Sequence, residues 1–177
     1  MSQNVSDLQP KSLWKYFDEI CKVPHPSKKE GKLLDYLKQT VEKLGYKPEQ
    51  DPVGNIVVRK PGSPGHEKAP RVLLQGHVDM VCEKNKGTEH DFDNDPIPAY
   101  VDGEWVKAKG TTLGADNGIG VALAMAALLS HDFNHVPIKG IFTVEEEVGL
   151  HGAFSLPPEW VSYPHMMINL DSEELDK

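Results

Sequence analysis

The segment Arg71-Val-Leu-Leu-Gln-Gly-His-Val-Asp79 is a short apolar run that ends in a histidine and an aspartate. Two other apolar runs end in acidic residues: Ile138 to Val144 leads into three glutamates, and Met166 to Leu170 leads into Asp171. Short apolar runs bounded by turn residues are typical of buried strands. Ligands of open α/β sheets bind beyond the carboxyl ends of the strands, so we expect these three segments to meet in space.

Helical spacing of apolar residues predicts three helices around these strands. The first runs from Lys11 to Val23. The second follows a capping box, Ser27-Lys-Lys-Glu30, and ends at Gly45, where a left-handed residue is expected. The third, Asn117 to Leu129, is almost entirely apolar and should be buried on most sides.

Further strands are expected at Ile56–Val58 and in a hairpin from Tyr100 to Val106, where Asp102-Gly103 favours a tight turn. Strands that alternate with helices indicate an α/β fold. We expect a mostly parallel or mixed sheet, buried on both sides and flanked by helices.

Composition excludes several classes of protein. At roughly 150 residues per domain, 177 residues allow one domain or little more. The longest apolar stretch, Ile119 to Leu129, is about half of what a membrane span needs, so no membrane partner is expected. Nineteen Lys and Arg against 27 Asp and Glu give a charge of −8, which disfavours nucleic acid. No signal peptide is visible, and Cys21 and Cys82 form no Cys-x-x-Cys motif, so we expect a cytoplasmic protein.

One histidine and several carboxylates form a mixed nitrogen and oxygen donor set that suits zinc or manganese, and two such ions can share a carboxylate. His77 would bind metal through one ring nitrogen, while Asp79, two residues along an extended segment, can hold the other. Glu146 and Glu147 point to opposite sides of an extended chain, so one can bind metal while the other faces water and substrate. Asp116 lies in a glycine-flanked turn before the third helix.

Each signal also has an ordinary explanation. A His-x-Asp pair is common, three glutamates are usually a solvated loop, and Asp116 could simply cap a helix. Two further patterns are rejected. The acidic stretch His90 to Pro96 has proline where a calcium loop needs glycine, and His131 and His135 lack the glutamate of the zinc-protease helix motif.

Taken together, the motifs resemble those of the di-zinc metallopeptidases related to carboxypeptidase G and aminoacylase, and most of all the aminoacyl-histidine dipeptidases. The motifs that carry this resemblance are Gly76-His-Val-Asp-Met-Val81, Gly110-Thr-Thr-Leu-Gly-Ala-Asp-Asn-Gly118, Glu146-Glu-Val-Gly149 and Asn169-Leu-Asp-Ser-Glu-Glu174. Shorter matches extend it to nearly the whole chain: Ile20-Cys-Lys-Val-Pro-His-Pro-Ser27, Val53-Gly-Asn-Ile56, His90-Asp-Phe92 and Asp95-Pro96.

The resemblance implies a role for each site residue and a cis peptide bond between Asp116 and Asn117. It places His77 and Asp171 on one zinc ion and Glu147 on the other, with Asp116 bridging both, Asp79 orienting His77 and Glu146 as the general base. Gly149 sets the register of the glutamates, because the family pattern is Glu-Glu, one residue, then Gly. Cobalt or manganese could replace zinc.

The resemblance also implies hydrolysis of dipeptides, with a preference for a C-terminal histidine, and a homodimer of the complete enzyme. Relatives are much longer, so residues 1–177 are expected to be the N-terminal part of the catalytic domain, without the lid or dimerisation domain and the C-terminal half. The distal histidine of the second zinc has no visible counterpart, so we expect the chain alone to bind at most one zinc tightly and to be nearly inactive.

Two alternatives remain open. An N-acyl amino acid deacylase or carboxypeptidase would share every metal ligand. A non-catalytic module that binds a partner through an exposed apolar surface is the alternative outside enzymes.

Overall fold

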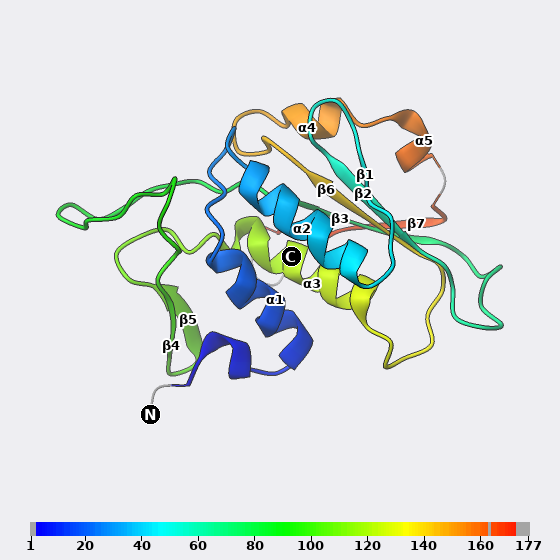
Figure 1. Cartoon of the computed structure of the whole chain (residues 1–177), viewed down its shortest axis with the longest axis horizontal. Coiled ribbons are helices and arrows are strands. Elements are labelled where there is room, and N and C mark those ends of the chain that lie inside the picture. Colours follow the sequence, from blue (N-terminus) through cyan, green and yellow to red (C-terminus); the bar gives the residue numbers. More distant parts are fainter. Residues whose placement is uncertain (1–2, 163, 173–177) are drawn as a thin grey trace.

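The computed structural model describes residues 3–162 and 164–172 (Figure 1). The helices are the short 3-10 helix η1 (Val5–Asp7), α1 (Lys11–Cys21), α2 (Gly31–Lys43), α3 (Ala115–Leu129), α4 (His151–Phe154) and α5 (Pro158–Val161). The strands are β1 (Glu49–Gln50), β2 (Ile56–Lys60), β3 (Val72–His77), β4 (Ala99–Asp102), β5 (Trp105–Ala108), β6 (Ile138–Thr143) and β7 (Met166–Asn169).

Five strands form one mixed sheet in the order β1-β2-β6-β3-β7. Strand β3 runs parallel to both β6 and β7, whereas β2 runs antiparallel to β6. Strands β4 and β5 pair as a separate hairpin. The predicted fold class, an α/β fold with a mixed sheet flanked by helices, is confirmed. Its consequence for the site is that β3, β6 and β7 all end at the same edge of the sheet.

The two faces of the sheet are covered differently. Helices α1, α2 and α3 lie on one face (Figure 1), and their apolar side chains form the main core, with Phe17, Leu37 and Met125 fully buried. The other face has a small core in which Trp160 of α5 packs with three strand residues. These residues are Val57, Leu73 and Ile141.

The predicted start of the second helix is wrong, and its predicted end is confirmed. The helix begins at Gly31, and the Ser27 hydroxyl does not cap it but donates a hydrogen bond of 2.8 Å to the buried Asp79 carboxylate. Gly45 has the expected positive φ of +84°, and the amide of Tyr46 reaches back to the carbonyl of Val41. This 6→1 bond is the pattern of a Schellman motif.

The prediction of a sheet buried on both sides is wrong at its edges. The side chains of β7 are exposed, with Met166, Met167 and Ile168 at 55%, 54% and 47%. Among the described strands β7 pairs only with β3, so it is an edge strand of the sheet. The two-residue strand β1 was not predicted, because Glu49-Gln50 carries no apolar signal.

The hairpin is confirmed, although Asp102 pairs with Trp105, so the central turn residues are Gly103 and Glu104. Within the described ranges, no helix has the length and apolar character needed to cross a membrane.

Candidate metal centre

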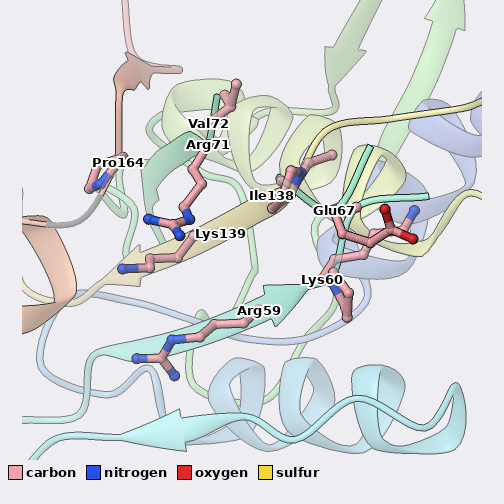
Figure 2. Close-up of a pocket in the computed structure, with 11 residues that line it drawn as sticks. Arg59, Lys60, Glu67, Arg71, Val72, Ile138, Lys139 and Pro164 are labelled. Atoms are coloured by element: carbon pink, nitrogen blue, oxygen red, sulfur yellow. The ribbon is translucent and has the colours of Figure 1, made fainter. Parts of the chain in front are cut away.

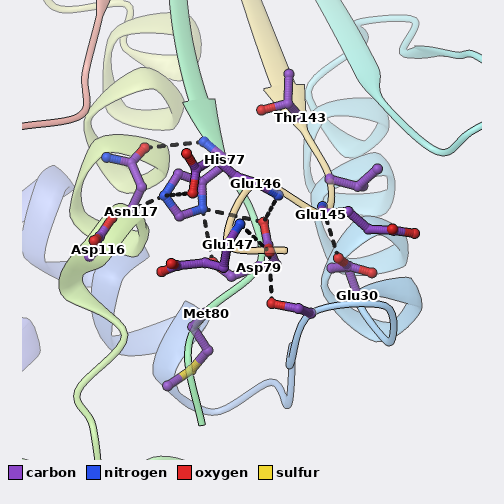
Figure 3. A network of polar contacts seen from close by, with 12 residues as sticks. Glu30, His77, Asp79, Met80, Asp116, Asn117, Thr143, Glu145, Glu146 and Glu147 are labelled. Carbon is purple, nitrogen blue, oxygen red and sulfur yellow. Dashed lines mark hydrogen bonds and ion pairs between the residues drawn. The ribbon is translucent and has the colours of Figure 1, made fainter. Parts of the chain in front are cut away.

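Four segments bring their polar side chains together at the carboxyl edge of the sheet (Figure 3). His77 is the last residue of β3, the glutamates Glu145 to Glu147 follow β6, and Asp171 follows β7. Asp116 comes from the start of α3, which lies against β3. The expected convergence of these segments is therefore present in the fold.

His77 lies at the centre of the cluster and is 1% exposed. Its Nε2 atom lies 3.0 Å from Asp116 Oδ1, 3.7 Å from Asp171 Oδ2 and 3.9 Å from Glu146 Oε2. Its Nδ1 atom faces Asp79, 3.3 Å from the carboxylate and 3.0 Å from the backbone carbonyl. Residue 79 thus holds Nδ1 in place, while Nε2 points at a group of carboxylates.

Asp79 is as buried as His77 and accepts three hydrogen bonds from two other segments. Its Oδ1 accepts the amide of Glu146 at 2.9 Å, and its Oδ2 accepts the amide of Glu147 at 3.1 Å and the Ser27 hydroxyl. The same carboxylate that orients the imidazole therefore also fixes the backbone of the two glutamates.

The peptide bond between Asp116 and Asn117 is cis, as predicted. Both residues have non-helical backbone angles, and the Asp116 carboxylate points at His77. The Asn117 side chain accepts the backbone amide of His77 and donates to the carbonyl of Leu170, at 3.2 and 2.8 Å. Asn117 therefore ties the ends of β3 and β7 together. The sequence predicted a cis peptide bond before Asn117 but gave its side chain no role.

The turn after β6 separates the three glutamates. The backbone of Glu145 is left-handed, with φ of +51°, and its carboxylate pairs with His151 at 3.1 Å. Its amide donates to the carboxylate of Glu30, which is buried and also accepts the amide of Lys28. Sequence reasoning missed Glu30 as a support of this turn, because the residue was assigned to a helix cap.

The chemistry of the donor set fits a divalent metal ion. Within the described residues, one group of at least three His, Cys, Asp or Glu side chains could hold a metal: His77, Asp116 and Glu147, whose ligand atoms all lie within 4.8 Å of one another. A neutral imidazole and carboxylates are the ligands that zinc and manganese accept. Neither rejected pattern forms such a group.

Electrostatics also favour a cation at this point. Burial opposes the charged form of His77, yet the adjacent Asp79 and Asp116 carboxylates raise its pKa to about 9. Burial and the neighbouring carboxylates raise the pKa values of Glu146, Glu147 and Asp171.

The fold of this chain is similar to that of known dipeptidases. No protein-family model matches the chain. The chain is 49% identical to the cytosol non-specific dipeptidase of Escherichia coli over 96% of its own length and 35% of that protein. It superposes with a TM-score of 0.94 on aminoacylhistidine dipeptidase from Vibrio alginolyticus, at 47% identity over 98% of this chain and 35% of the other.

A tripeptidase structure from Staphylococcus aureus has the same fold, with a TM-score of 0.76 at 22% identity over 94% of this chain and 44% of that one. The chain spans about a third of the length of the two dipeptidases that it matches. The resemblance to dipeptidase-type metallopeptidases, predicted from the motifs, is confirmed.

Proposed function

We propose that the chain forms the metal-binding part of a peptidase that hydrolyses the peptide bond of dipeptides with a metal-activated water. The observation that carries this proposal is the cluster of His77, Asp116 and Glu147 at the carboxyl edge of the sheet. The identity of nearly half to a cytosolic dipeptidase supports dipeptides as the substrate class and the cytoplasm as the location.

The proposed metal ligands are those that the family resemblance implies. His77 and Asp171 would hold one zinc ion, Glu147 would hold a second, and Asp116 would be shared by both. The position of Asp116, close to His77 and grouped with Glu147, supports the bridging role. When bound, zinc acidifies a water molecule and polarises the scissile carbonyl.

Two further carboxylates have proposed roles that do not require metal ligation. Asp79 holds Nδ1 of His77, so that Nε2 is left to face the metal. Glu146 acts as the general base, taking a proton from the attacking water and delivering it to the leaving amine. Burial and the surrounding carboxylates raise the pKa of Glu146, which suits a group that must both accept and return a proton.

The preference for a C-terminal histidine rests on the aminoacylhistidine dipeptidase likeness alone. The N-terminal position of the chain within a catalytic domain and the homodimer of the complete enzyme also stay predictions. Hydrolysis of a panel of dipeptides and N-acyl amino acids by the full-length gene product separates a dipeptidase from a deacylase.

Zinc content tests the metal centre directly. We expect the dialysed chain to retain about one zinc ion by elemental analysis, and Asp116→Ala to lose it, because the variant removes a ligand shared by both ions. Asp102→Ala, which removes an exposed carboxylate of the β4–β5 hairpin, is the matched control and should keep the metal. Equal zinc in the parent and in Asp116→Ala would contradict the proposed site.

A further inference from the structure

A pocket of about 310 Å³ lies beside the metal centre and is lined by the segment after β3, the turn before α3 and the turn after β6. Asp116 and Glu147, two of the proposed metal ligands, form part of its lining, and Val81, Leu113 and Ala115 form an apolar part. On the basis of the peptidase function proposed above, we propose that this pocket receives the side chain of the N-terminal residue of the dipeptide, and that Val81 and Leu113 select an apolar one.

Hydrogen bonds hold two of the lining segments together. The amide of Thr112 donates to the carbonyl of Glu83 at 2.8 Å. The amide of Asn85 donates to the carbonyl of Gly110 at 2.9 Å. The Thr112 hydroxyl donates to the carbonyl of Val81 at 2.7 Å, so it already has a partner within the wall. Val81 is thereby fixed beside the segment that leads into α3.

The turn before α3 packs closely on the segment after β3. Gly114 is buried and has a positive φ of +69°, and a Cβ atom at this position would lie 2.8 Å from Sδ of Met80. Glycine therefore allows the turn to approach Met80 directly. Leu113 packs partly against the main core, whereas Val81 is 45% exposed. The two aliphatic side chains thus reach the pocket from segments whose positions are fixed.

The charges of the lining indicate which residue of the substrate enters the pocket. Among the described residues that line it, the ionisable ones are Asp116 and Glu147, with no lysine or arginine. The C-terminal residue of a dipeptide carries a carboxylate, which would need a cationic partner here. The N-terminal residue carries an ammonium group, which carboxylates attract, and its side chain is attached next to the scissile carbonyl. The pocket therefore fits the N-terminal residue.

The apolar part of the lining determines the kind of side chain. The side chains of Val81, Leu113 and Ala115 offer no hydrogen-bond partner, so a polar group would lose water there without compensation. One methylene group in an apolar pocket changes kcat/KM by about tenfold or more. The volume is at the lower end of small-molecule sites, about 300 to 1,000 Å³, which suits one side chain with its ammonium group.

A second cavity of about 310 Å³ lies at the opposite end of the strands, too far from the metal centre to serve the same substrate (Figure 2). Its lining includes Val72 at the start of β3, whereas His77 is the last residue of that strand. Five residues of extended strand correspond to about 17 Å, and an extended dipeptide spans only about 7 Å. Figure 2 shows the charged heads of Arg59, Arg71 and Lys139 on one side of β2 and β6. This cationic end of the strands therefore has no part in binding the dipeptide.

The test is hydrolysis of two pairs of dipeptides by the full-length gene product. Leu-Ala and Gly-Ala differ in the N-terminal side chain, and Ala-Leu and Ala-Gly differ in the C-terminal one. Val81→Thr replaces a methyl by a hydroxyl group at nearly constant shape and should lower the kcat/KM ratio of Leu-Ala to Gly-Ala by about fivefold to tenfold. Leu113→Ala should lower this ratio at least as much. The ratio of Ala-Leu to Ala-Gly should stay unchanged in both variants.

Val53→Thr is the matched control, because Val53 lies outside the pocket and is 49% exposed, close to the value for Val81. Its two ratios should equal those of the parent. Circular dichroism and zinc content establish that each variant is folded and keeps its metal.

Parent-like ratios in both Val81→Thr and Leu113→Ala would overturn the assignment of the pocket and leave the peptidase function intact. A change confined to the ratio of Ala-Leu to Ala-Gly would also overturn it, because the pocket would then hold the C-terminal residue. If the parent hydrolyses none of the four dipeptides, the proposed function and the assignment of the pocket both fail.

A second measurement needs no activity and uses the metal-free chain. In an NMR titration, 3-methylbutylamine should bind about tenfold more tightly than methylamine or better, because its apolar group enters the pocket. The anion 4-methylpentanoate, which has the same apolar group, should not bind. Equal affinity for the two amines, or binding of 4-methylpentanoate at the pocket, would contradict the proposal.

Discussion

The two ends of strands β3 and β6 carry opposite charges and hold them in different ways. At the carboxyl end, Nε2 of His77 faces three carboxylates. On the other side of the ring, Asp79 accepts hydrogen bonds from the backbone amides of Glu146 and Glu147. At the amino end, Arg59 and Lys139 stand opposite each other on the sheet face, with one ion pair at the rim. At the acidic end, buried hydrogen bonds hold the carboxylate of Asp79. At the cationic end, the strand register sets the positions of the side chains, Lys139 makes a buried hydrogen bond to the carbonyl of Trp160, and the ion pair of Arg59 with Glu49 is about half exposed.

This difference has an energetic consequence. A buried carboxylate that satisfies several donors cannot be removed without leaving those donors unpaired. An exposed ion pair is screened by water and contributes little to stability. Substitutions of comparable size at the two ends should therefore differ several-fold in their effect on the free energy of unfolding.

The largest effect is expected for Asp79→Ala. The substitution leaves the amides of Glu146 and Glu147 and the Ser27 hydroxyl without their partner. It also removes the charged neighbour of buried His77, which keeps only the backbone carbonyl of residue 79. Removing one partner of a buried charged pair costs about 3–5 kcal/mol, and we expect a loss of that size in the free energy of unfolding of the metal-free chain, measured with urea.

The control for this measurement is Asp102→Ala, because Asp102 forms an exposed ion pair with Lys107. Its cost should stay below about 1 kcal/mol. Equal losses in the two variants would mean that the buried network contributes no more than a surface ion pair.

Glu30 provides a smaller effect and a conservative variant. Both of its hydrogen bonds, from the amides of Lys28 and Glu145, reach the same oxygen, Oε1. Glu30→Gln keeps that oxygen and should keep both bonds. Glu30→Ala leaves two part-buried amides without their acceptor, at a cost of about 1–3 kcal/mol.

Metal affinity separates a local effect of Glu30 from a general loss of stability. Because Glu30 supports the turn that presents Glu146 and Glu147, the alanine variant should also bind zinc more weakly, and the glutamine variant should not. Weakened zinc binding in both variants would show that the charge of Glu30, and not its hydrogen bonds, is what matters.

The elements of the acidic end could be predicted from the sequence, because each metal-type side chain directly follows an apolar run or a glycine-rich turn. The amide network behind them could not. Asn117 and Glu30 act on backbone groups more than 30 residues away in sequence, and no local pattern marks such a partner. Ser27 shows the same limit, because its sequence signature is that of a helix cap while its hydroxyl binds Asp79.

The cationic end was missed for a related reason. Arg59, Arg71 and Lys139 are separated in sequence and follow no motif, and they meet only because β2 runs antiparallel to β6 while β3 runs parallel to it. The composition, with its net charge of −8, indicated only that nucleic acid is an unlikely partner. The exposure of β7 was also missed, because an apolar run does not reveal whether its strand is central or at an edge.

Zinc affinity at the acidic end should also depend strongly on pH. The pKa of His77 is raised to about 9, so its Nε2 is protonated at neutral pH and a metal ion must displace that proton. Zinc affinity should therefore fall as the pH falls below 9, by about tenfold per pH unit between pH 6 and 8. Calorimetry in two buffers with different ionisation enthalpies counts the protons released, and we expect about one at pH 7.

A comparison variant for this measurement is Asp79→Asn. The loss of the neighbouring charge should lower the pKa of His77, so the steep part of the pH profile should shift to lower pH. A zinc affinity that does not change between pH 6 and 8 would argue against His77 as a ligand.

The smallest effect on stability is expected at the cationic end, for Glu49→Gln. The ion pair of Glu49 with Arg59 is about half exposed on both sides, so its loss should cost less than about 1 kcal/mol in urea unfolding. Asp35→Asn, which removes an exposed helix ion pair with Lys38, is the matched control.

The dependence on salt distinguishes the two variants. At low salt, the cost of Glu49→Gln should exceed that of Asp35→Asn, because Glu49 also offsets the charge of Lys139. At high salt this excess should disappear, because the charges are screened. A loss above about 2 kcal/mol that persists in high salt would place the cationic end in the same energetic class as the buried Asp79 network, and the contrast between the two ends would then be wrong.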